Sequence, residues 1–295
     1  MTMNYTPFIS VIIPTYHDWD RLKLCLEALK IQTYSLECFE VLVVNNDPDD
    51  LPPYKINSGN VRLLKESKKG SYAARNAGIM QAKSEILAFI DSDCIPKPNW
   101  LRNGIVSITD DSENSIVAGH VNVFPKLLNK PNIVELFSMN FELNQEKYVK
   151  IKRFATANVF IKKNVFKSIG NFNHSLKSNG DFELATRAVN NFFSIKYCKN
   201  CVVDHPARSS FNQISIKAKR KAGGAYDSLS ILKISVIRLV LSIFKLFMTD
   251  SLKVLISKNS VKNKLKLIFV IIFYQTIKIL ELMNLIFRKK NSERR

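Results

Sequence analysis

Short apolar runs that alternate with helical patterns are the feature that most constrains this chain. In the helical patterns apolar residues recur every three or four positions, and each run between them has the length of a strand. Because strands that alternate with helices form a mostly parallel sheet with helices on both faces, the sequence predicts an α/β fold. The expected strands are 8–14, 39–44, 61–64 and 85–90, and the expected helix caps are Asp20 and Ser71.

Polar residues follow three of the expected strands. Thr15-Tyr16, Asn45-Asn46-Asp47 and Asp91-Ser92-Asp93 each come directly after an apolar run. Ligands of parallel α/β sheets bind beyond the carboxyl ends of the strands. We therefore expect the three polar clusters to form one ligand site at one edge of the sheet.

Asp91 and Asp93 indicate a metal ion. In an extended segment residues i and i+2 face the same side, so both carboxylates would face one ligand. Two like charges this close repel each other unless a cation or a cationic group lies between them. Mg²⁺ and Mn²⁺ take oxygen ligands from carboxylates, water and substrate phosphates, which makes the pair a candidate site for either ion. A solvated loop after a strand is the alternative.

The positive charge of the chain is concentrated near its C-terminal end. The 295 residues carry a formal net charge of +19, and residues 205–295 hold 19 Lys and Arg against four Asp and Glu. This distribution indicates a polyanionic partner, either nucleic acid or acidic lipid headgroups. Two apolar helical segments, near 228–248 and 265–287, are interrupted and flanked by basic residues. Because neither offers about 20 uncharged apolar residues, we expect helices that lie in a membrane interface, with packing on the same globule or dimerisation as the alternative.

The cysteines and the N-terminal residues indicate the cellular compartment of the protein. Five Cys at irregular spacing do not form a disulfide framework, which favours a reducing cytosol. The N-terminal residues lack the basic and then apolar order of a signal peptide. We therefore expect a cytoplasmic protein that lies peripherally on the inner face of the cell membrane.

The first turns of two expected helices contain candidate binding or catalytic residues. Gly70 opens a helix that contains Arg75, and a helix N-terminus with an Arg suits a phosphate group, although an ordinary amphipathic helix has the same pattern. Asp181 follows Gly180 at another apparent helix start. A carboxylate there would accept a proton from a hydroxyl if it faces a pocket, or it would cap the helix, and the two roles are compatible.

His205 follows an expected short strand, 201–204. It would complete a metal site with Asp93 and a diphosphate. In a second interpretation, Cys198, Cys201 and His205 bind zinc, but a fourth ligand has no clear candidate. A histidine without a special role is the third possibility.

Together these pieces resemble glycosyltransferase family 2. The resemblance covers about residues 8–225, and although each motif is short, their order and spacing are specific. It implies a GT-A fold, to which this chain adds C-terminal amphipathic helices, and transfer of a sugar from a nucleotide diphosphate donor with inversion. The matching motifs are Ser10-Val-Ile-Ile-Pro-Thr-Tyr16, Glu40-Val-Leu-Val-Val-Asn-Asn-Asp47, Gly70 with Ala74-Arg-Asn76, Asp91-Ser-Asp93, and Gly180-Asp181 with Leu184 and Arg187.

The resemblance also implies roles for single residues. A Mg²⁺ or Mn²⁺ ion would bind Asp93 as its principal ligand, with Asp91 and His205 beside it, and Asp181 would be the general base. The donor would be a nucleotide sugar, with a UDP-sugar favoured. It would contact Pro14, Thr15, Tyr16, Asn46, Asp47, Gly70, Arg75, Asp91, Ser92 and Arg208.

Two positions depart from the family pattern. Many members have an acid pair where this chain has Asn45-Asn46, and an amide there would still pair with the edge of a nucleobase. Many also have Glu-Asp where this chain has Gly180-Asp181, so the expected base is kept and a supporting carboxylate is lost.

The expected organisation has three parts. Residues 1–95 would bind the nucleotide sugar, residues 96–227 would bind the acceptor and carry the base, and residues 228–295 would associate with an acidic membrane surface. The acceptor would be a saccharide or a lipid-linked saccharide in the assembly of cell-surface polysaccharide or glycolipid. The alternatives are a sugar nucleotidyltransferase and a basic nucleic-acid-binding protein. The first usually needs a glycine-rich basic loop that 14–18 lacks, and no nucleic-acid partner is expected, because the basic residues alternate with apolar stretches that suit lipid better.

Overall fold

The computed structural model describes residues 7–57, 59–110, 115–231, 236–256 and 260–288. These residues form two compact units, which we describe separately. The first unit comprises Met1–Asn122, Leu143–His174 and Gly180–His205, and the second comprises Val123–Glu142, Ser175–Asn179 and Pro206–Arg295.

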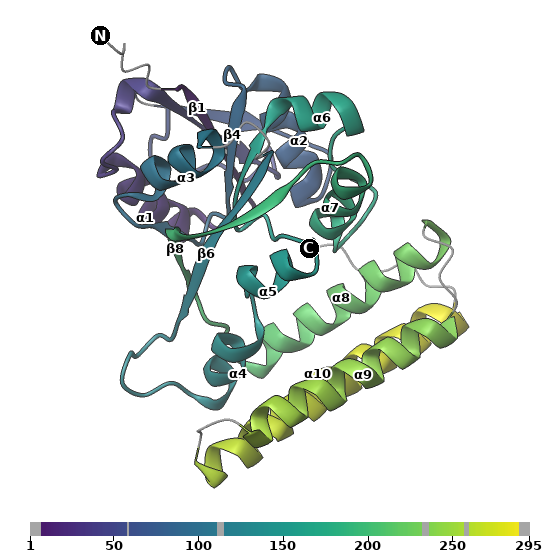
Figure 1. The fold of residues 1–295 in the computed structure, drawn as a ribbon. Helices are drawn as coiled ribbons and strands as arrows, with labels where there is room; N and C mark the ends of the chain where they lie inside the picture. Colours follow the sequence, from purple (N-terminus) through teal and green to yellow (C-terminus); the bar gives the residue numbers. More distant parts are fainter. Residues whose placement is uncertain (1–6, 58, 111–114, 232–235, 257–259, 289–295) are drawn as a thin grey trace. The chain divides into compact units, whose positions relative to one another are not determined.

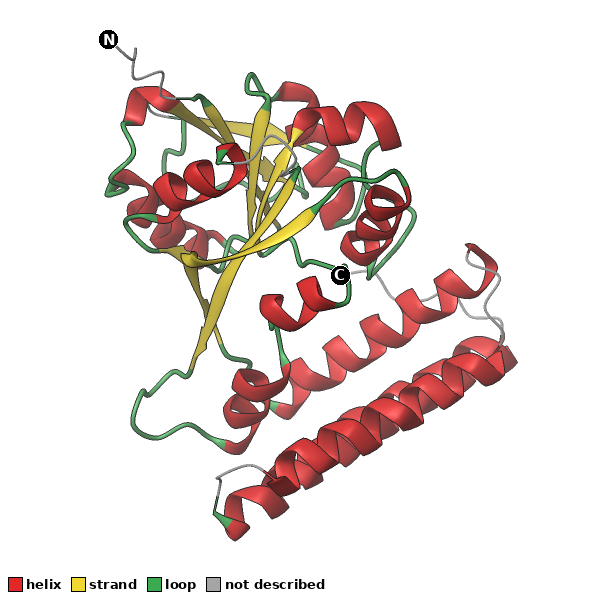
Figure 2. Ribbon diagram, viewed as in Figure 1, coloured by secondary structure: helices red, strands yellow, loops and turns green. Residues whose placement is uncertain are grey.

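The strands, yellow in Figure 2, form an eight-stranded sheet within the described part of the chain, and their order in this sheet is β3-β2-β1-β4-β7-β6-β8-β5. Strands β1, β2, β3 and β4 pair in parallel, whereas β7 runs antiparallel to β4 and β6, and β5 runs antiparallel to β8. The strands are β1 (Ile9–Thr15), β2 (Phe39–Asn45), β3 (Val61–Lys65), β4 (Ile86–Ile90), β5 (Ile95–Pro96), β6 (Ile116–Phe124), β7 (Asn158–Lys162) and β8 (Ile195–Pro206).

Helices cover both faces of this sheet, as the sequence predicts. Figure 1 shows α1 and α3 on one side of the strands and α2, α6 and α7 on the other. All residues of β1 and β2 are buried, which is typical of parallel strands covered from both sides. The helices of the first unit are α1 (Trp19–Lys30), α2 (Ser71–Gln81), α3 (Trp100–Thr109), α5 (Gln145–Lys150), α6 (Lys163–Ile169) and α7 (Gly180–Asn190), with a short 3₁₀ turn at Leu36–Cys38.

The expected α/β architecture is therefore confirmed, and the strand ends 15–16, 45–47 and 91–93 do lie at one edge of the parallel strands. The N-cap of α1 is Asp18 rather than Asp20, and that of α2 is Gly70 rather than Ser71. Residues 157–161 are predicted from the sequence to be a strand, but the antiparallel direction of β7 beside β4 is not, because an apolar run does not indicate the direction of its strand.

Glycines allow two close approaches in this unit. A Cβ added to Gly78 of α2 would lie 2.5 Å from Cγ2 of Ile12, so α2 lies directly on β1. A Cβ at Gly119 of β6 would lie 2.4 Å from Nδ2 of Asn158. The Asn158 side chain fills that space and donates hydrogen bonds to the carbonyl oxygens of His120 and Cys201, which ties β7 to β6 and β8.

The second unit is helical in the described residues. Its helices are α4 (Ile133–Phe141), α8 (Phe211–Ile231), α9 (Val236–Ile256) and α10 (Val261–Arg288). Helix α10 packs against α8, α9 and α4, and its buried face includes Leu267, Val270 and Ile271. Of the C-terminal region predicted from the sequence, residues 232–235, 257–259 and 289–295 lie outside the described residues. None of the helices described is long and apolar enough to cross a bilayer.

A buried ionic cluster joins α4 to α8. Glu142, at the end of α4, accepts a hydrogen bond from Ser138 at 2.7 Å and pairs with Lys217 of α8 at 2.8 Å and with Arg208. Burial alone would raise the pKa of Glu142, but the charges of Lys217 and Arg208 outweigh it and lower the pKa to about 2. The carboxylate is therefore ionised wherever the two cations are held against it.

The cluster should give the second unit an acid-labile contribution to stability. Because the pKa of Glu142 is lower in the folded protein than its usual value of 4.5, the contribution is complete above that value and is lost as the pH falls toward 2. A shift of this size corresponds to roughly 3 kcal/mol. We expect the thermal unfolding midpoint, followed by circular dichroism, to fall more steeply over this range in the native protein than in Glu142→Gln.

The matched control is Glu146→Gln, which removes an exposed carboxylate paired with Lys150. Solvent screens that pair, so this variant should keep the acid profile of the native protein. A Glu142→Gln profile as steep as that of the native protein would contradict the assignment.

Candidate functional site

The residues after β4 form a turn, which corrects the expectation of an extended segment. The backbone N–H of Cys94 donates to the carbonyl oxygen of Asp91 at 3.1 Å. Strand alternation therefore does not set the directions of the Asp91 and Asp93 side chains, because the strand ends at Ile90. Each carboxylate has partners of its own.

The partners of the two carboxylates are arginines from different helices. Asp91 pairs with Arg75 of α2 at 2.5 Å, and Asp93 pairs with Arg21 of α1 at 3.4 Å. Arg75 is only 4% exposed, and the exposed fraction of the Asp91 side chain is 33%. The repulsion that the sequence analysis identified is thus balanced within the chain by two guanidinium groups.

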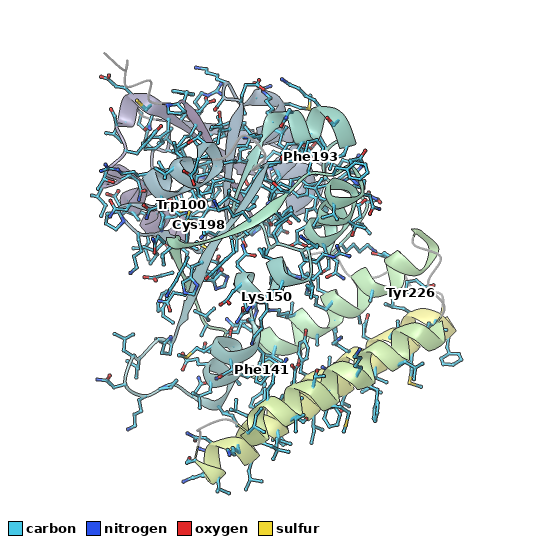
Figure 3. The ribbon with its side chains drawn as sticks, viewed as in Figure 1. Trp100, Phe141, Lys150, Phe193, Cys198 and Tyr226 are labelled. Atoms are coloured by element: carbon cyan, nitrogen blue, oxygen red, sulfur yellow. The ribbon has the colours of Figure 1, made fainter. Side chains whose placement is uncertain are left out.

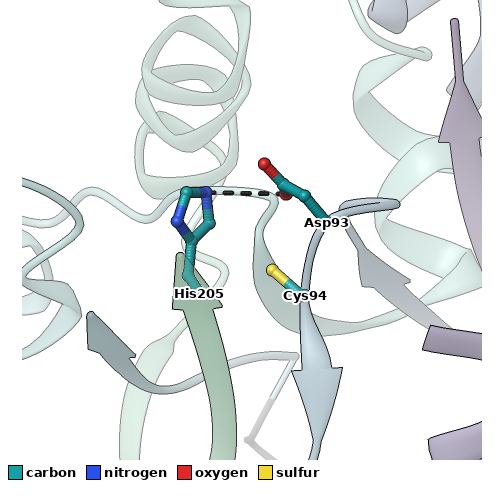
Figure 4. A group of neighbouring side chains, drawn as sticks. All are labelled: Asp93, Cys94 and His205. Atoms are coloured by element: carbon teal, nitrogen blue, oxygen red, sulfur yellow. Dashed lines mark ion pairs between the residues drawn. The ribbon is translucent and has the colours of Figure 1, made fainter. Parts of the chain in front are cut away.

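His205 lies beside Asp93, as expected. Strand β8 pairs with β5 through Asp204 and Ile95, which brings His205 next to the turn after β4. Its Nε2 lies 3.6 Å from Oδ1 of Asp93, and the donor atoms of Asp93, Cys94 and His205 all lie within 4.8 Å of one another (Figure 4). Asp91 is outside this group, so its role as a metal ligand stays a prediction.

The donor atoms of this group fit a divalent metal ion. A carboxylate oxygen and an imidazole nitrogen would hold Mg²⁺ or Mn²⁺, with the remaining positions for water and phosphate oxygens. The thiol of Cys94 is a soft donor, which these ions disfavour. The zinc interpretation has no support among the described residues, because Cys198 and Cys201 do not gather with His205 in a group of potential ligands.

Asp18 and Arg21 are parts of this site that the sequence analysis missed. Asp18 accepts hydrogen bonds from Ser92 at 3.2 Å and from Nε of Arg21 at 2.7 Å. It thereby holds the Asp-Ser-Asp turn against the start of α1. Their position in the sequence could have indicated this, since both residues follow the end of β1 at the same sheet edge. The pattern for helix capping favoured Asp20 instead.

Tyr16, His17 and Asp47 form an exposed cluster after β1 and β2. The rings of Tyr16 and His17 lie 4.2 Å apart, and Nε2 of His17 lies 2.7 Å from Oδ2 of Asp47. The hydrogen bond with His17 lowers the pKa of Asp47. Pro14 and Thr15 are buried behind this cluster, and the Thr15 hydroxyl finds no hydrogen-bond partner within the described residues. The cluster offers an aromatic face and a carboxylate to a ligand.

Asn46 holds the loop that leads into α2. Its amide donates to the carbonyl oxygens of Glu66 at 3.1 Å and Lys68 at 2.8 Å, and its oxygen accepts from the N–H of Gly70 at 2.7 Å. A carboxylate has no proton to donate, so an acid at this position would leave both carbonyl groups without this donor. Gly70 itself has φ +118°, a conformation that favours glycine.

One face of α2 links the turn after β4 to the start of α7. Tyr72, Arg75 and Asn76 are spaced three and four residues apart and therefore share that face. The N–H of Gly180 donates to the hydroxyl of Tyr72 at 2.8 Å. Asn76 exchanges two hydrogen bonds with the backbone of Phe172, at 2.8 and 3.0 Å. The same helix thus holds Asp91, through Arg75, and the segment that carries Asp181.

Asp181 lies in the first turn of α7, where it was predicted. Burial raises the pKa of the Tyr72 phenol, and the charge of Asp181 raises it further, so this carboxylate is close to Tyr72. A Cβ on Gly180 would lie 2.6 Å from a carbon of the Tyr72 ring. The glutamate that many family members have at this position would therefore collide with that ring. Arg187 pairs with Glu183 at 2.7 Å.

Arg208 belongs to the second unit, where it pairs with Glu142. Its predicted contact with a diphosphate stays a prediction, like the donor-binding roles of the other residues named above.

Comparison with known proteins finds relatives of this chain among glycosyltransferases. The sequence model of the family described as Glycosyl transferase family 2 matches residues 10–170. The glycosyltransferase AglE of Haloferax volcanii is 33% identical over 210 residues, which are 68% of this chain and 68% of that protein. A UDP-Glc:alpha-D-GlcNAc-diphosphoundecaprenol beta-1,3-glucosyltransferase of Escherichia coli, WfgD, is 27% identical over 147 residues, which are 48% of this chain and 55% of that protein.

A solved structure has the same fold. It is the mannosyltransferase PcManGT from Pyrobaculum calidifontis in complex with GDP-Man and Mn²⁺, with a TM-score of 0.65 and 16% identity. The match covers 97% of this chain and 89% of that chain. The predicted GT-A fold is thereby confirmed.

The link between Tyr72 and Gly180 should be measurable as stability. In Tyr72→Phe the buried N–H of Gly180 loses its acceptor, so we expect the free energy of unfolding to fall by about 1–3 kcal/mol in urea denaturation. Tyr16→Phe is the matched control, because the Tyr16 side chain is exposed and the change should stay within about 0.5 kcal/mol. Equal stability of both variants would show that the hydrogen bond contributes nothing.

Proposed function

Because the chain belongs to glycosyltransferase family 2 and is therefore a glycosyltransferase, we propose that it moves a sugar from a nucleoside diphosphate donor to a hydroxyl acceptor with inversion. The observation that carries the proposal is the face of α2 that joins Arg75 and Asp91 to Tyr72 and the start of α7. It supports a site in which groups for a diphosphate and a candidate base are held by one helix.

The donor would bind along the carboxyl ends of β1, β2 and β4. Tyr16 and Asp47 offer a ring face and hydrogen-bond acceptors to a nucleoside, and Asp91 offers an acceptor to the ribose. We favour a UDP-sugar, while the solved relative carries GDP-Man, so both bases belong in the test. Asn46 would act indirectly, because its amide already holds the loop before α2.

The reaction needs stabilisation of the departing diphosphate. As the bond to the sugar breaks, negative charge develops on the β-phosphate, and a Mg²⁺ or Mn²⁺ ion held by Asp93 and His205 would offset that charge. Arg75 and Arg21 hold the side chains of Asp91 and Asp93 in position before the donor arrives. The carboxylate that would hold the metal ion would thus be positioned before the donor binds.

Asp181 would remove the proton of the acceptor hydroxyl. A sugar hydroxyl is a weak nucleophile, so a carboxylate opposite the leaving group assists by accepting its proton as the new bond forms. Attack on the side opposite the diphosphate inverts the configuration at the sugar carbon. Tyr72 fixes the backbone just before this carboxylate, through the N–H of Gly180.

The acceptor would be a saccharide or a lipid-linked saccharide, in the assembly of cell-surface polysaccharide or glycolipid. The second unit supports this, because α9 and α10 expose stripes of apolar side chains at helical spacing in addition to the face that α10 buries. Such stripes exceed what packing of the unit requires and are typical of an interaction surface. They comprise Leu241, Phe244, Met248, Leu252 and Leu255 on α9, and Leu265, Phe269, Ile272, Ile279, Met283 and Phe287 on α10.

The partner of these stripes would be an acidic membrane surface on the cytoplasmic side. Exposed lysines, among them Lys245, Lys253 and Lys266, lie on the same two helices. In an interfacial helix, apolar side chains enter the boundary of the acyl chains while lysines contact acidic headgroups. The two helices offer both kinds of side chain. Duplex DNA would use the lysines and leave the apolar stripes exposed, so we disfavour nucleic acid as the partner. Family membership likewise disfavours a sugar nucleotidyltransferase.

Two variants test the reaction. We expect Asp181→Asn to lower kcat about 10²- to 10⁴-fold while the donor still raises the melting temperature, because only the proton acceptor is lost. Asp93→Asn should lose the Mn²⁺-dependent part of that rise, measured against UDP- and GDP-sugars. The matched control is Asp110→Asn, an exposed carboxylate paired with Lys196, which should change neither. Normal turnover of Asp181→Asn would refute the base assignment.

A second experiment tests the membrane surface. The double variant Phe244→Glu/Met283→Glu should co-sediment with acidic liposomes at least about tenfold more weakly than the native protein, because each change removes an apolar side chain and adds a repelled charge. The control is Phe192→Glu, since Phe192 is 98% exposed but lies in the first unit. Equal loss in both variants, or stronger binding to duplex DNA than to liposomes over a salt series, would contradict the proposal.

A further inference from the structure

Two cysteines lie outside the site, in the first half of β8. Cys198 and Cys201 have two residues between them. Buried and less buried side chains alternate along the later part of β8, but Lys199 and Asn200 are both exposed. The strand therefore departs from regular alternation at this point, and both cysteine sulfur atoms contact carbonyl oxygens of α3.

The two sulfur atoms lie against the same helix, α3. The Cys198 sulfur is 4.0 Å from the carbonyl oxygen of Asn103, and the Cys201 thiol, the Ser107 hydroxyl and the backbone N–H groups of Asn200 and Cys201 are the polar groups that act on it. The Cys201 sulfur is buried and lies 3.5 Å from the carbonyl oxygen of Trp100 at the start of α3. Figure 3 labels Trp100 and Cys198 where β8 passes this helix.

The two thiols differ in acidity and in access. The influence of the Cys201 thiol, together with the other polar groups, outweighs burial and lowers the pKa of Cys198 to about 6. Burial raises the pKa of Cys201. Cys198 is half-buried and Cys201 fully buried. A half-exposed thiolate thus lies against a buried thiol, which is the arrangement of a nucleophilic and a resolving cysteine.

We propose that Cys198 and Cys201 form a redox-active dithiol that exchanges with low-molecular-weight disulfides such as glutathione disulfide. The Cys198 thiolate attacks one sulfur of glutathione disulfide, forms a mixed disulfide and releases one glutathione thiolate. Cys201 then loses its proton and attacks the Cys198 sulfur, which forms the internal disulfide and releases the second glutathione thiolate. The dithiol is oxidised by two electrons, and one glutathione disulfide is reduced to two glutathione molecules, which take up the two protons.

The proposal does not depend on the sugar-transfer reaction. Cys25 and Cys94 are buried and no second cysteine follows them at this spacing, while Cys38 is half-buried like Cys198. Cys38 is therefore the internal control for exposure alone.

Peptide mapping of the full chain tests the exchange. Trypsin cleaves after Lys199, between the two cysteines, so the internal disulfide would join two tryptic peptides that separate on reduction. After treatment with glutathione disulfide and alkylation of the remaining thiols, we expect this joined pair in the native chain and not in Cys198→Ser. In Cys201→Ser, glutathione should stay on Cys198. Glutathione on Cys38 in preference to Cys198, or no joined pair, would overturn the proposal.

A second measurement uses the native chain and does not depend on how the variants fold. At pH 5.5 a thiol of pKa about 6 should be alkylated by iodoacetamide about tenfold faster than an ordinary thiol of pKa about 8.5, after allowance for its lower nucleophilicity. We expect alkylation of Cys198 to reach a plateau above pH 7, while that of Cys38 continues to rise. A continued rise at Cys198 as well would overturn the proposal.

Discussion

The ion pair between Arg75 and Asp91 is the interaction on which the rest of the site depends. Arg75 is almost fully buried in α2, where a guanidinium without a carboxylate would be strongly destabilising. The pair therefore fixes α2 against the end of β4. Because Tyr72 and Asn76 lie on the same helix face, the position of α2 also sets the position of Phe172 and of the start of α7.

Packing behind the site also helps to fix the position of α2. Gly78 lets α2 lie directly on β1, so the helix face with Arg75 sits at the sheet edge where β1, β2 and β4 end. Further along the sheet, the Asn158 side chain on β7 donates hydrogen bonds to the backbone of β6 and β8, and His205 near the end of β8 lies beside Asp93. Two polar anchors in the first unit, Arg75 and Asn158, thus bring together groups that are far apart in sequence.

The strands of this fold are well predicted from the sequence. Continuous apolar runs such as 39–44 are buried on both sides, and a run of that length is typical of a strand in a parallel sheet. The sequence also predicts that Asp91 and Asp93 lie at the sheet edge where β1 and β2 end, because the carboxyl ends of neighbouring parallel strands lie together. It does not predict the turn after β4, in which the two carboxylates have different partners, since this turn depends on a backbone hydrogen bond at Cys94. The contact of Tyr72 with Gly180, 108 positions away, has no local signal at all. The predicted helix caps, Asp20 and Ser71, lie two residues and one residue after the observed N-caps, because several polar residues there satisfy the same local rule.

The phenol ring of Tyr72 fills the volume next to Gly180 that a larger side chain would need. Positions 72 and 180 are therefore coupled, and neither can change freely on its own. Anyone who grafts the acidic dipeptide of other family members onto this scaffold would have to exchange both residues at once, a small one for the tyrosine and a glutamate for the glycine. In a library of variants the two substitutions would be tolerated together far more often than the glutamate alone.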